Sequence, residues 1–405
     1  MKPIVRAGRM KPVHSDIRGP LFVEAMKRQK QGIDILKLNT GNPATFGFGL
    51  PDSIKNALME HMQDGVGYCD FKGMPQARQA ICDYETSKGI NGITSDDVFI
   101  GNGVSEVVSF ALTPLLNDGD EVLVPSPSYS LWGNSVYLED GKPVFYTCDE
   151  QANWYPDIQD IRSKITDKTK AIVIINPNNP TGVLYPKEIL LEIIQVAREF
   201  GLLIFADEIY DRLVMDGKQH ISLASLTEDV PVITLNGLSK SHCLCGYRCG
   251  WMVISGPREL TEDYRQGIIQ LTSLRLCANT MAQIVIPAAL DDMETPASMV
   301  RPGGRIYEQR EATVRELEKI DGLSFVKNDA AFYVFPKLDV KKFNITNDKQ
   351  FAHDLLDATN ILLVPGSGFD WKDPDHFRIV MLPQADILSD AIRRMGTFLD
   401  GYKQK

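Results

Sequence analysis

The middle of the chain alternates short apolar runs with longer stretches of helical periodicity. Seven of these runs are predicted strands, at Val98–Ile100, Glu121–Val124, Val144–Tyr146, Ala171–Ile175, Leu202–Ala206, Val232–Leu235 and Trp251–Ile254. Several are rich in Val, Ile and Leu and lack polar alternation, which is typical of parallel strands buried on both faces. Between two of them, Lys187–Phe200 carries apolar residues at helical spacing. The alternation predicts an α/β fold, with a large domain whose seven-stranded, mostly parallel sheet is flanked by helices.

The pattern changes after about residue 290. The predicted elements are then a helix at Gly304–Lys319, strands at Phe325–Val326 and Ala331–Pro336, a helix at Asp348–Ala358, strands at Ile361–Val364 and Phe377–Leu382, and a helix at Ala385–Leu399. This mixture predicts a second, smaller α+β domain. We therefore expect residues 49–290 to form the large domain and residues 291–405 the small one. Residues 1–48 are expected to form an N-terminal segment that packs with the small domain.

Composition argues against several kinds of partner. The 405 residues carry a formal net charge of −10, which argues against nucleic acid. No apolar run is long enough to cross a bilayer, and the N-terminus MKPIVRAGRMKPV lacks the apolar core of a signal peptide. The seven cysteines are irregularly spaced, which indicates reduced thiols. We therefore expect a cytoplasmic protein with no membrane and no nucleic-acid partner.

Polar residues follow several predicted strands, at the edge where open α/β sheets bind ligands. Gly101–Glu106 leads into a helix, which fits either an anion site or an ordinary N-capped turn. Asn176–Gly182 contains two prolines and a glycine, so Asn179 is either directed at a ligand or part of a surface turn. Asp207 ends an apolar strand, where it either pairs with a cation or caps the next helix.

The stretch VITLNGLSKSHCLCGYRCG, residues 232–250, places Ser239 and Lys240 just past a strand and Arg248 eight residues later. A second cation is expected to disfavour the ammonium form of Lys240, which makes the amine a better nucleophile. The planar fork of an arginine suits phosphate oxygens. A lysine nucleophile beside a phosphate anchor is typical of enzymes that use pyridoxal 5'-phosphate (PLP). Taken alone, a lysine is far more often a solvated surface residue.

Together these loops resemble a known family. Asn-Pro-Thr-Gly from Asn179, Asp-x-x-Tyr from Asp207, and Ser-Lys with an arginine eight residues on are similar to the fold type I PLP-dependent aminotransferases of class I/II. The spacing also agrees, at 28 residues from Asn179 to Asp207 and 33 from Asp207 to Lys240. The resemblance runs from Leu38 to Leu382. Within the family, LNTGNP, IGNGVSE, IINPNNPTG, FADEIY, NGLSK, LRLCAN and DHFRIV are most similar to bacterial glutamate–pyruvate (alanine) aminotransferases.

The resemblance implies roles around the cofactor ring. Lys240 would bind the cofactor covalently and later move the α-proton of the substrate, and Asp207 would pair with the ring nitrogen. Asn179 and Tyr210 would hydrogen-bond the phenolic oxygen of the ring. Tyr129 would stack on the ring, where the residue type alone indicates a core aromatic. The expected catalytic residues are thus Lys240, Asp207 and Tyr210.

The resemblance also assigns a phosphate site. It implies the backbone of Val104 and Ser105, the Ser105 hydroxyl, Ser239 and Arg248 as ligands. Tyr68, in GYCDFKG, resembles the tyrosine that reaches the phosphate from the other subunit. A homodimer with shared active sites is therefore implied, and the large domain becomes the PLP-binding domain.

The substrate site follows from the same resemblance. Arg378, in HFRIVMLP, occupies the place of the arginine that binds the substrate carboxylate, although an arginine on a strand often faces outward. Gly41 matches the glycine whose backbone contacts that carboxylate, and Asn179 is placed beside it. A distal carboxylate needs a second cation, for which Arg18 and Arg275 are both candidates.

The implied function is transfer of an amino group between L-alanine and 2-oxoglutarate by a ping-pong cycle, which gives pyruvate and L-glutamate. The alternatives are an aminotransferase for aspartate, aromatic or branched amino acids, a PLP-dependent Cβ–S lyase and, more remotely, a regulator that senses PLP. Cys243, Cys245 and Cys249 lie near His242 in the sequence, which raises zinc as an option. Their spacing lacks the paired C-x₂-C knuckles of zinc sites, so no metal is expected.

Overall fold

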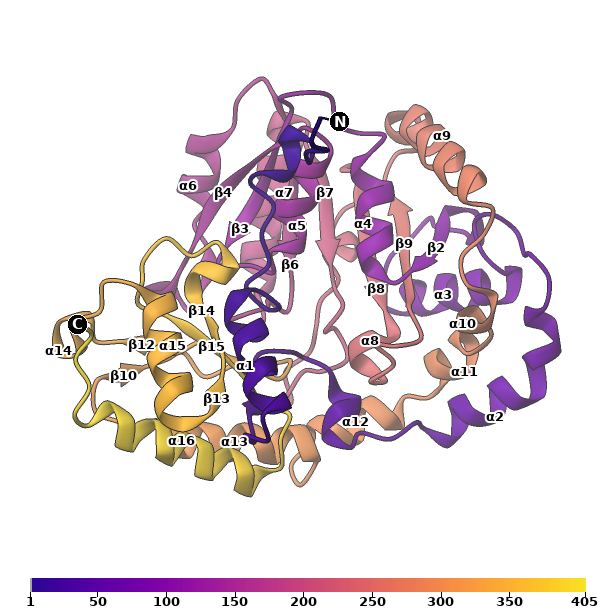
Figure 1. Ribbon diagram of the computed structural model, residues 1–405. Coiled ribbons are helices and arrows are strands. Elements are labelled where there is room, and N and C mark those ends of the chain that lie inside the picture. The colour runs from indigo at the N-terminus through magenta and orange to yellow at the C-terminus, as the bar shows by residue number, and fades with distance from the viewer. Residues whose placement is uncertain (1) are drawn as a thin grey trace.

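The computed structural model describes residues 2–405 as one large sheet with a smaller group of helices and short strands beside it (Figure 1). The large sheet has eight strands, in the spatial order β2 (Val98–Asn102), β9 (Cys249–Ser255), β8 (Val232–Gly237), β7 (Leu203–Asp207), β6 (Thr169–Ile175), β3 (Glu121–Ser126), β4 (Lys142–Asp149) and β5 (Tyr155–Pro156). All seven predicted strands are present. The eighth, β5, has only two residues, which is too short to show a period in the sequence.

The strand directions bring several loops to one edge of the sheet. Strands β4, β3, β6, β7 and β8 pair in parallel, as predicted. Strand β9 is antiparallel to both β8 and β2, so β2 runs in the same direction as the parallel strands. The carboxyl ends of β2, β3, β6, β7 and β8 therefore share an edge, where a ligand site is expected.

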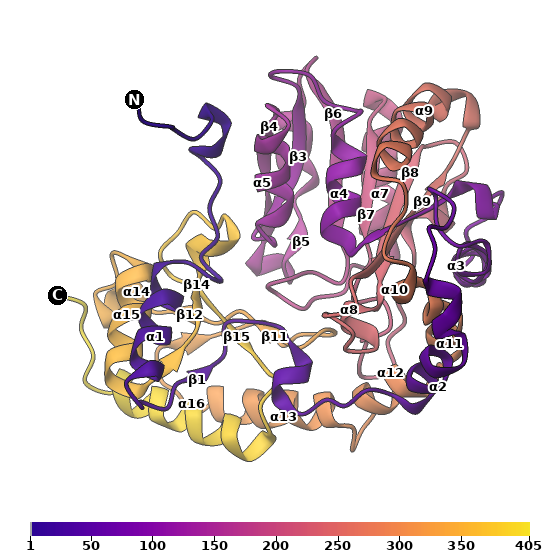
Figure 2. The same cartoon turned by 45° about the vertical axis from the view of Figure 1, so that its right-hand side comes forward.

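Helices cover both faces of this sheet (Figure 2). One core lies beneath the helices at Val104–Leu112, Leu131–Leu138 and Arg258–Arg275, and the other lies beneath those at Ile158–Lys164 and Lys187–Phe200. The helices of this part are α2 (Asp52–His61), α3 (Pro75–Ser87), α4 (Val104–Leu112), α5 (Leu131–Leu138), α6 (Ile158–Lys164), α7 (Lys187–Phe200), α8 (Leu238–Ser241), α9 (Arg258–Arg275), α10 (Thr280–Ile284), α11 (Ile286–Asp291) and α12 (Glu294–Val300). Burial on both faces explains why the strands are apolar without alternation.

The smaller group has its own core. Its helices are α1 (Pro20–Lys30), α13 (Arg305–Leu317), α14 (Val340–Phe343), α15 (Asp348–Thr359) and α16 (Ala385–Leu399). Its strands are β1 (Leu36–Lys37), β10 (Leu323–Ser324), β11 (Tyr333–Val334), β12 (Lys337–Leu338), β13 (Ile361–Leu362), β14 (Val364–Pro365) and β15 (Phe377–Val380). The predicted strand at Phe325–Val326 is wrong by two residues, because Leu323 and Ser324 are the residues that pair with β12. Strand β1 pairs in parallel with β13, which joins the N-terminal segment to this group.

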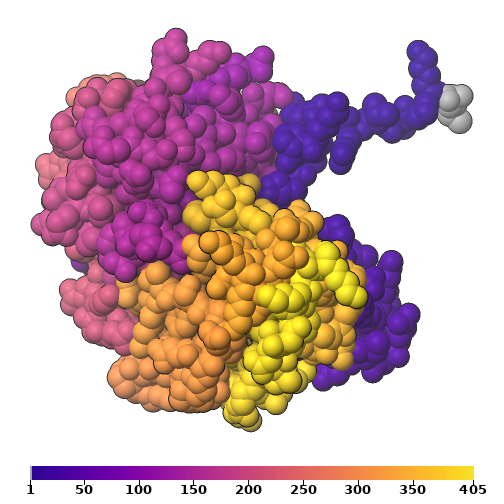
Figure 3. Space-filling view, turned by 90° about the vertical axis from the view of Figure 1, so that its left-hand side faces the viewer, coloured from indigo at the N-terminus to yellow at the C-terminus, as the bar shows by residue number. Residues whose placement is uncertain are grey.

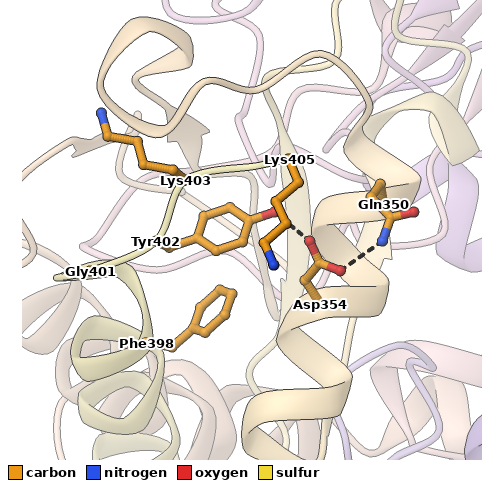
Figure 4. A pocket seen from close by; sticks show the side chains of 7 residues that line it. All are labelled: Gln350, Asp354, Phe398, Gly401, Tyr402, Lys403 and Lys405. Carbon is orange, nitrogen blue, oxygen red and sulfur yellow. Dashed lines mark hydrogen bonds between the residues drawn. The ribbon is translucent and has the colours of Figure 1, made fainter.

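The two ends of the chain pack differently. Residues near the N-terminus project from the body (Figure 3), and the side chains of Ile4 and Val5 are exposed. At the other end, Tyr402 donates a 2.7 Å hydrogen bond to Oδ2 of Asp354 on α15 (Figure 4). This contact borders a shallow hollow of about 560 Å³ beside the C-terminus.

Within residues 2–405, no helix on its own has the length and hydropathy of a membrane span, and only α9 together with Thr280–Asp291, bent by 119°, meets both criteria.

Candidate active site

A cavity of about 780 Å³ lies at the carboxyl edge of the large sheet, against the smaller group. Its walls come from the N-terminal segment, from loops after β2, β3, β6, β7 and β8, and from β11 and β15. The lining includes most of the residues expected from the sequence, namely Arg18, Gly41, Val104, Ser105, Tyr129, Asn179, Asp207, Tyr210, Ser239, Lys240, Arg248 and Arg378. It also includes Ser15, Ile17, Cys245 and Tyr333, which were not predicted.

Lys240 lies in the short helix α8, just past the end of β8. Its Nζ donates a 3.0 Å hydrogen bond to the carbonyl of Gly41. Burial lowers the pKa of Lys240, but Tyr333, Cys245 and Tyr129 raise it by more, so its pKa lies above that of a free lysine. The expected depression of this pKa by a neighbouring cation is therefore wrong for the protein alone. The cation that lowers the pKa of Lys240 is Arg378, and its effect is smaller than those of the groups that raise this pKa.

Asp207 is the last residue of β7 and is 5% exposed. Its Oδ2 accepts a 3.0 Å hydrogen bond from Nε1 of Trp132, and its Oδ1 accepts a 3.4 Å bond from the backbone of Ile209. Burial raises the pKa of this carboxyl to about 6, and these hydrogen bonds offset only part of the rise. The strand thus ends in an acid to which no cation in the described part of the chain is bonded.

Arg378, on β15, is 1% exposed and points into the cavity. Its Nη1 donates a 2.9 Å hydrogen bond to Oδ1 of Asn179, and its Nη2 donates to the carbonyl of Asn39. The guanidinium lies 4.6 Å from the ring centroids of both Tyr333 and Phe369. Burial lowers the pKa of Arg378, while the nearby ionisable groups that raise it are tyrosines rather than carboxylates. The outward-facing alternative for this arginine is excluded.

Tyr333 is a residue of this site that the sequence did not reveal. Its hydroxyl lies 2.9 Å from that of Tyr210, and its ring supports Arg378. A Cβ placed on Gly41 would lie 2.3 Å from the Tyr333 hydroxyl, so only glycine fits there. A lone tyrosine in a predicted strand carries no signal beyond that of a core aromatic, so nothing local marked it.

The start of helix α4 forms a cup beside Arg248. Gly103 precedes the helix with φ +83°, and a Cβ there would lie 2.3 Å from Nη2 of Arg248. The guanidinium donates to the carbonyls of Cys245, at 3.0 Å, and of Asn102, at 3.4 Å. Unpaired N–H groups at a helix start and an adjacent guanidinium together favour an anion. Val104, Ser105 and Ser239 also line this end of the cavity.

Two predicted residues lie outside the cavity. The side chain of Tyr68 is 84% exposed and does not line the cavity. Arg275 is bonded to Glu106 and does not reach the cavity, so Arg18 is the candidate for a distal carboxylate that lines it. Within residues 2–405, no group of three or more His, Cys, Asp or Glu side chains is arranged to hold a metal.

The fold and the site define an aminotransferase: the chain belongs to the class I and II aminotransferases, whose family model matches residues 33–392. Its relatives include the glutamate-pyruvate aminotransferase AlaA of Haemophilus influenzae, which is 49% identical over 404 residues and covers 100% of both chains. The solved structure of an aminotransferase from Escherichia coli is 46% identical, with a TM-score of 0.98 over 100% of both chains. The alanine aminotransferase of Pyrococcus furiosus is 40% identical, with a TM-score of 0.93, and the match covers 98% of this chain and 100% of that one.

Proposed function

We propose that this enzyme uses PLP to transfer the amino group between L-alanine and 2-oxoglutarate, with pyruvate and L-glutamate as products. The observation that carries the proposal is a half-buried lysine, Lys240, in one cavity with a buried acid, Asp207, to which no cation among residues 2–405 is bonded. The substrate pair is supported by relatives named glutamate-pyruvate aminotransferase, which are 47–49% identical over their full length.

The residues present fit PLP. A protonated ring nitrogen would supply the cation that the buried Asp207 carboxylate lacks. The raised pKa of Asp207, about 6, reflects the lack of that cation. The cup at Gly103 and Arg248 suits the phosphate, since it offers helix N–H groups and a guanidinium. A volume of about 780 Å³ is ample for a cofactor with a small amino acid.

We assign the roles around the ring as follows. Lys240 holds the cofactor covalently and carries the α-proton of the substrate, and Asp207 keeps the ring nitrogen protonated. Tyr210 and the amide nitrogen of Asn179 donate to the phenolic oxygen, since the amide oxygen of Asn179 already accepts from Arg378. Tyr129 covers the ring face. When bound, PLP supplies the electron sink that makes the α-proton removable.

The phosphate and the subunit arrangement belong to the same proposal. Val104, Ser105, Ser239 and Arg248 would hold the phosphate. Tyr68 would reach the phosphate of a second subunit, which its exposure permits. We therefore propose a homodimer with shared active sites.

Recognition of the substrate would rest on two arginines. Arg378 presents a fork already oriented by Asn179 and two aromatic rings, so it can take the α-carboxylate in a bidentate manner. The backbone of Gly41 closes the site beside Arg378, since the carbonyl of Gly41 accepts a hydrogen bond from Lys240. Arg18 would take the distal carboxylate of glutamate. The domain limits at residues 48 and 290 and the cytoplasmic location remain predictions.

Purified protein with bound PLP, mixed with L-alanine and no oxo acid, tests the proposal. The visible absorbance band is expected to disappear as one equivalent of pyruvate forms per subunit, and 2-oxoglutarate is expected to restore it. Continued pyruvate release with free ammonia would indicate a lyase instead. Lys240→Ala should abolish borohydride fixation of the cofactor, whereas Lys142→Ala, at a side chain that is 66% exposed, should not. A colourless protein that is indifferent to added PLP would refute the proposal.

A further inference from the structure

Arg275 ends helix α9 and lies against the loop Gly101–Glu106, outside the cavity. Its Nη1 donates a 2.6 Å hydrogen bond to Oε2 of Glu106. Its Nη2 donates to the carbonyls of Ile100, at 3.2 Å, and Phe71, at 3.1 Å. With the side chain 13% exposed, all of these bonds are largely shielded from water. The guanidinium therefore ties three segments of the chain together.

Glu106 connects Arg275 to the end of β2 by hydrogen bonds. Its Oε2 also accepts from the backbone N–H of Asn102, at 2.7 Å, and its Oε1 accepts from Nδ2 of Asn102, at 2.9 Å. The carbonyl of Asn102 in turn accepts from Nη2 of Arg248. A continuous path of hydrogen bonds thus runs from Arg275 through Glu106 and Asn102 to the guanidinium beside the anion cup.

The position of Glu106 makes its pairing electrostatically important. It is the third residue of α4, next to the N–H groups that would receive a phosphate. An unpaired carboxylate there would repel a phosphate anion and compete with it for the same helix end. Arg275 neutralises this carboxylate and holds it against the strand.

The third bond of Arg275 reaches the segment that carries Tyr68. Phe71, whose carbonyl accepts from Nη2, is three residues after Tyr68. The same guanidinium therefore fixes both the cup of its own subunit and the segment that presents Tyr68 outward.

We infer that Arg275 is a positioning residue for the phosphate of the cofactor, acting through Glu106 and Asn102, and not a ligand of the distal carboxylate of the substrate. The inference rests on the proposed function, since it requires PLP as the ligand. It predicts an effect that depends on the phosphate group alone, which a general loss of stability would not produce.

Arg275→Met is the test variant, and helix α9 offers a matched control. Arg265, on the same helix, donates a 2.6 Å hydrogen bond to Asp97, which precedes the opposite end of β2. Both ion pairs are buried or nearly so and equally short, but only one lies at the cofactor edge. Arg265→Met should therefore share any cost in stability without changing the phosphate site.

Dissociation constants for PLP and for pyridoxal, which lacks the phosphate, would be measured on cofactor-free wild type and both variants. Arg275→Met should weaken PLP binding on the order of tenfold, as expected for one weakened charged hydrogen bond, and leave pyridoxal binding unchanged. Arg265→Met should leave the ratio of the two constants as in wild type. Arg275→Lys, which restores the charge, should recover part of the loss.

An unchanged ratio in Arg275→Met, or equal losses for PLP and pyridoxal, would overturn the inference. The inference would also be overturned if the KM rose for 2-oxoglutarate but not for pyruvate while the ratio of the PLP and pyridoxal dissociation constants stayed unchanged. That result would assign Arg275 to binding of the substrate. If Arg275→Met does not fold, Arg275→Gln, which keeps a polar end, takes its place in the same comparison. Failure of wild type to bind PLP at all would refute the proposed function itself.

Discussion

Trp132 Nε1 donates a 3.0 Å hydrogen bond to Oδ2 of Asp207, so that helix α5 fixes the direction of the acid at the end of β7. This bond holds the carboxylate in place without neutralising it. Burial raises the pKa of Asp207 to about 6, from the 3.8 of a free aspartate. The folded protein without cofactor therefore binds a proton at this group more tightly than the unfolded chain does.

The first prediction concerns Asp207→Asn in the cofactor-free protein. Since the folded pKa is the higher one, this group costs stability that grows as pH rises from about 4 to 6 and is constant above that range. The variant should therefore be more stable than wild type at pH 8, by up to roughly 3 kcal/mol, and by about half as much at pH 5. Urea unfolding at both pH values measures this.

The matching control is the PLP-loaded protein. There the cation of the ring nitrogen should favour the aspartate, so wild type should be the more stable form. An advantage for Asp207→Asn that is the same at pH 5 and pH 8 would contradict the raised pKa.

The second prediction concerns Arg378→Lys. A lysine cannot form the bidentate contact or stack between Tyr333 and Phe369, so the KM for L-alanine should rise on the order of a hundredfold. Arg310→Lys is the control, because Arg310 is also fully buried and lies over a tyrosine, but it is paired with Asp216 outside the cavity. Steady-state kinetics should show an unchanged KM for this control; equal increases in both variants would contradict the role of Arg378.

The third prediction concerns Arg18→Met. Only 2-oxoglutarate and glutamate carry a second carboxylate, so the KM for these should rise on the order of tenfold or more, with that for pyruvate unchanged. Arg9→Met is a control on the same segment, since Arg9 pairs with Asp140 at 3.0 Å and does not line the cavity. An equal rise in the KM for pyruvate would show that Arg18 does not discriminate between 2-oxoglutarate and pyruvate.

The fourth prediction concerns Lys88, the cation of a buried cluster behind the Asp207–Tyr210 loop. Its Nζ lies 2.7 Å from Glu85, 2.8 Å from Glu208 and 3.2 Å from Asp211. Burial lowers the pKa of Lys88, but these carboxylates raise it by more, so below about pH 10 its charge stabilises the fold wherever the carboxylates are ionised.

Lys88→Met should therefore lower the free energy of unfolding by about 3–5 kcal/mol at pH 7, because it leaves buried carboxylates without their cation. Lys142→Met, at an exposed lysine 2.8 Å from Glu121, should cost at most about 1 kcal/mol. Denaturant titration of both variants compares them. Similar losses of unfolding free energy in Lys88→Met and Lys142→Met would mean that charge does not stabilise the cluster.

Elements with a clear period were predictable from the sequence. The helices α7 and α16 begin and end at the predicted residues. Two of the two-residue strands, β5 and β12, were not predicted, since a strand of that length has no alternation. Strands β11 and β13 lie within the longer strands predicted at Ala331–Pro336 and Ile361–Val364. The pairing of Leu323 with Leu338, which defines β10, depends on a contact between distant residues and leaves no local trace.

The residues of the site likewise divide into those that the sequence predicted and those that it did not. Asn179, Asp207 and Lys240 follow strands of one sheet, so the rule for strand ends was sufficient to bring them together. Tyr333 lines the cavity from the smaller group, and Trp132 is bonded to Asp207 from helix α5. Nothing in the neighbouring sequence distinguishes either residue from a core aromatic. Of the two arginines left open for the distal carboxylate, the fold brings only Arg18 to the cavity, because Arg275 ends a helix beneath the loop at Glu106.

The setting of Arg378 has a practical consequence. Its positive charge is enclosed by two aromatic rings and an amide, and its Nε has no hydrogen-bond partner among residues 2–405. Such a centre is an anion receptor even before any reaction takes place. Acetate or formate in a buffer will compete for it, so the enzyme's apparent affinity for amino acids should depend on the salt in which it is prepared.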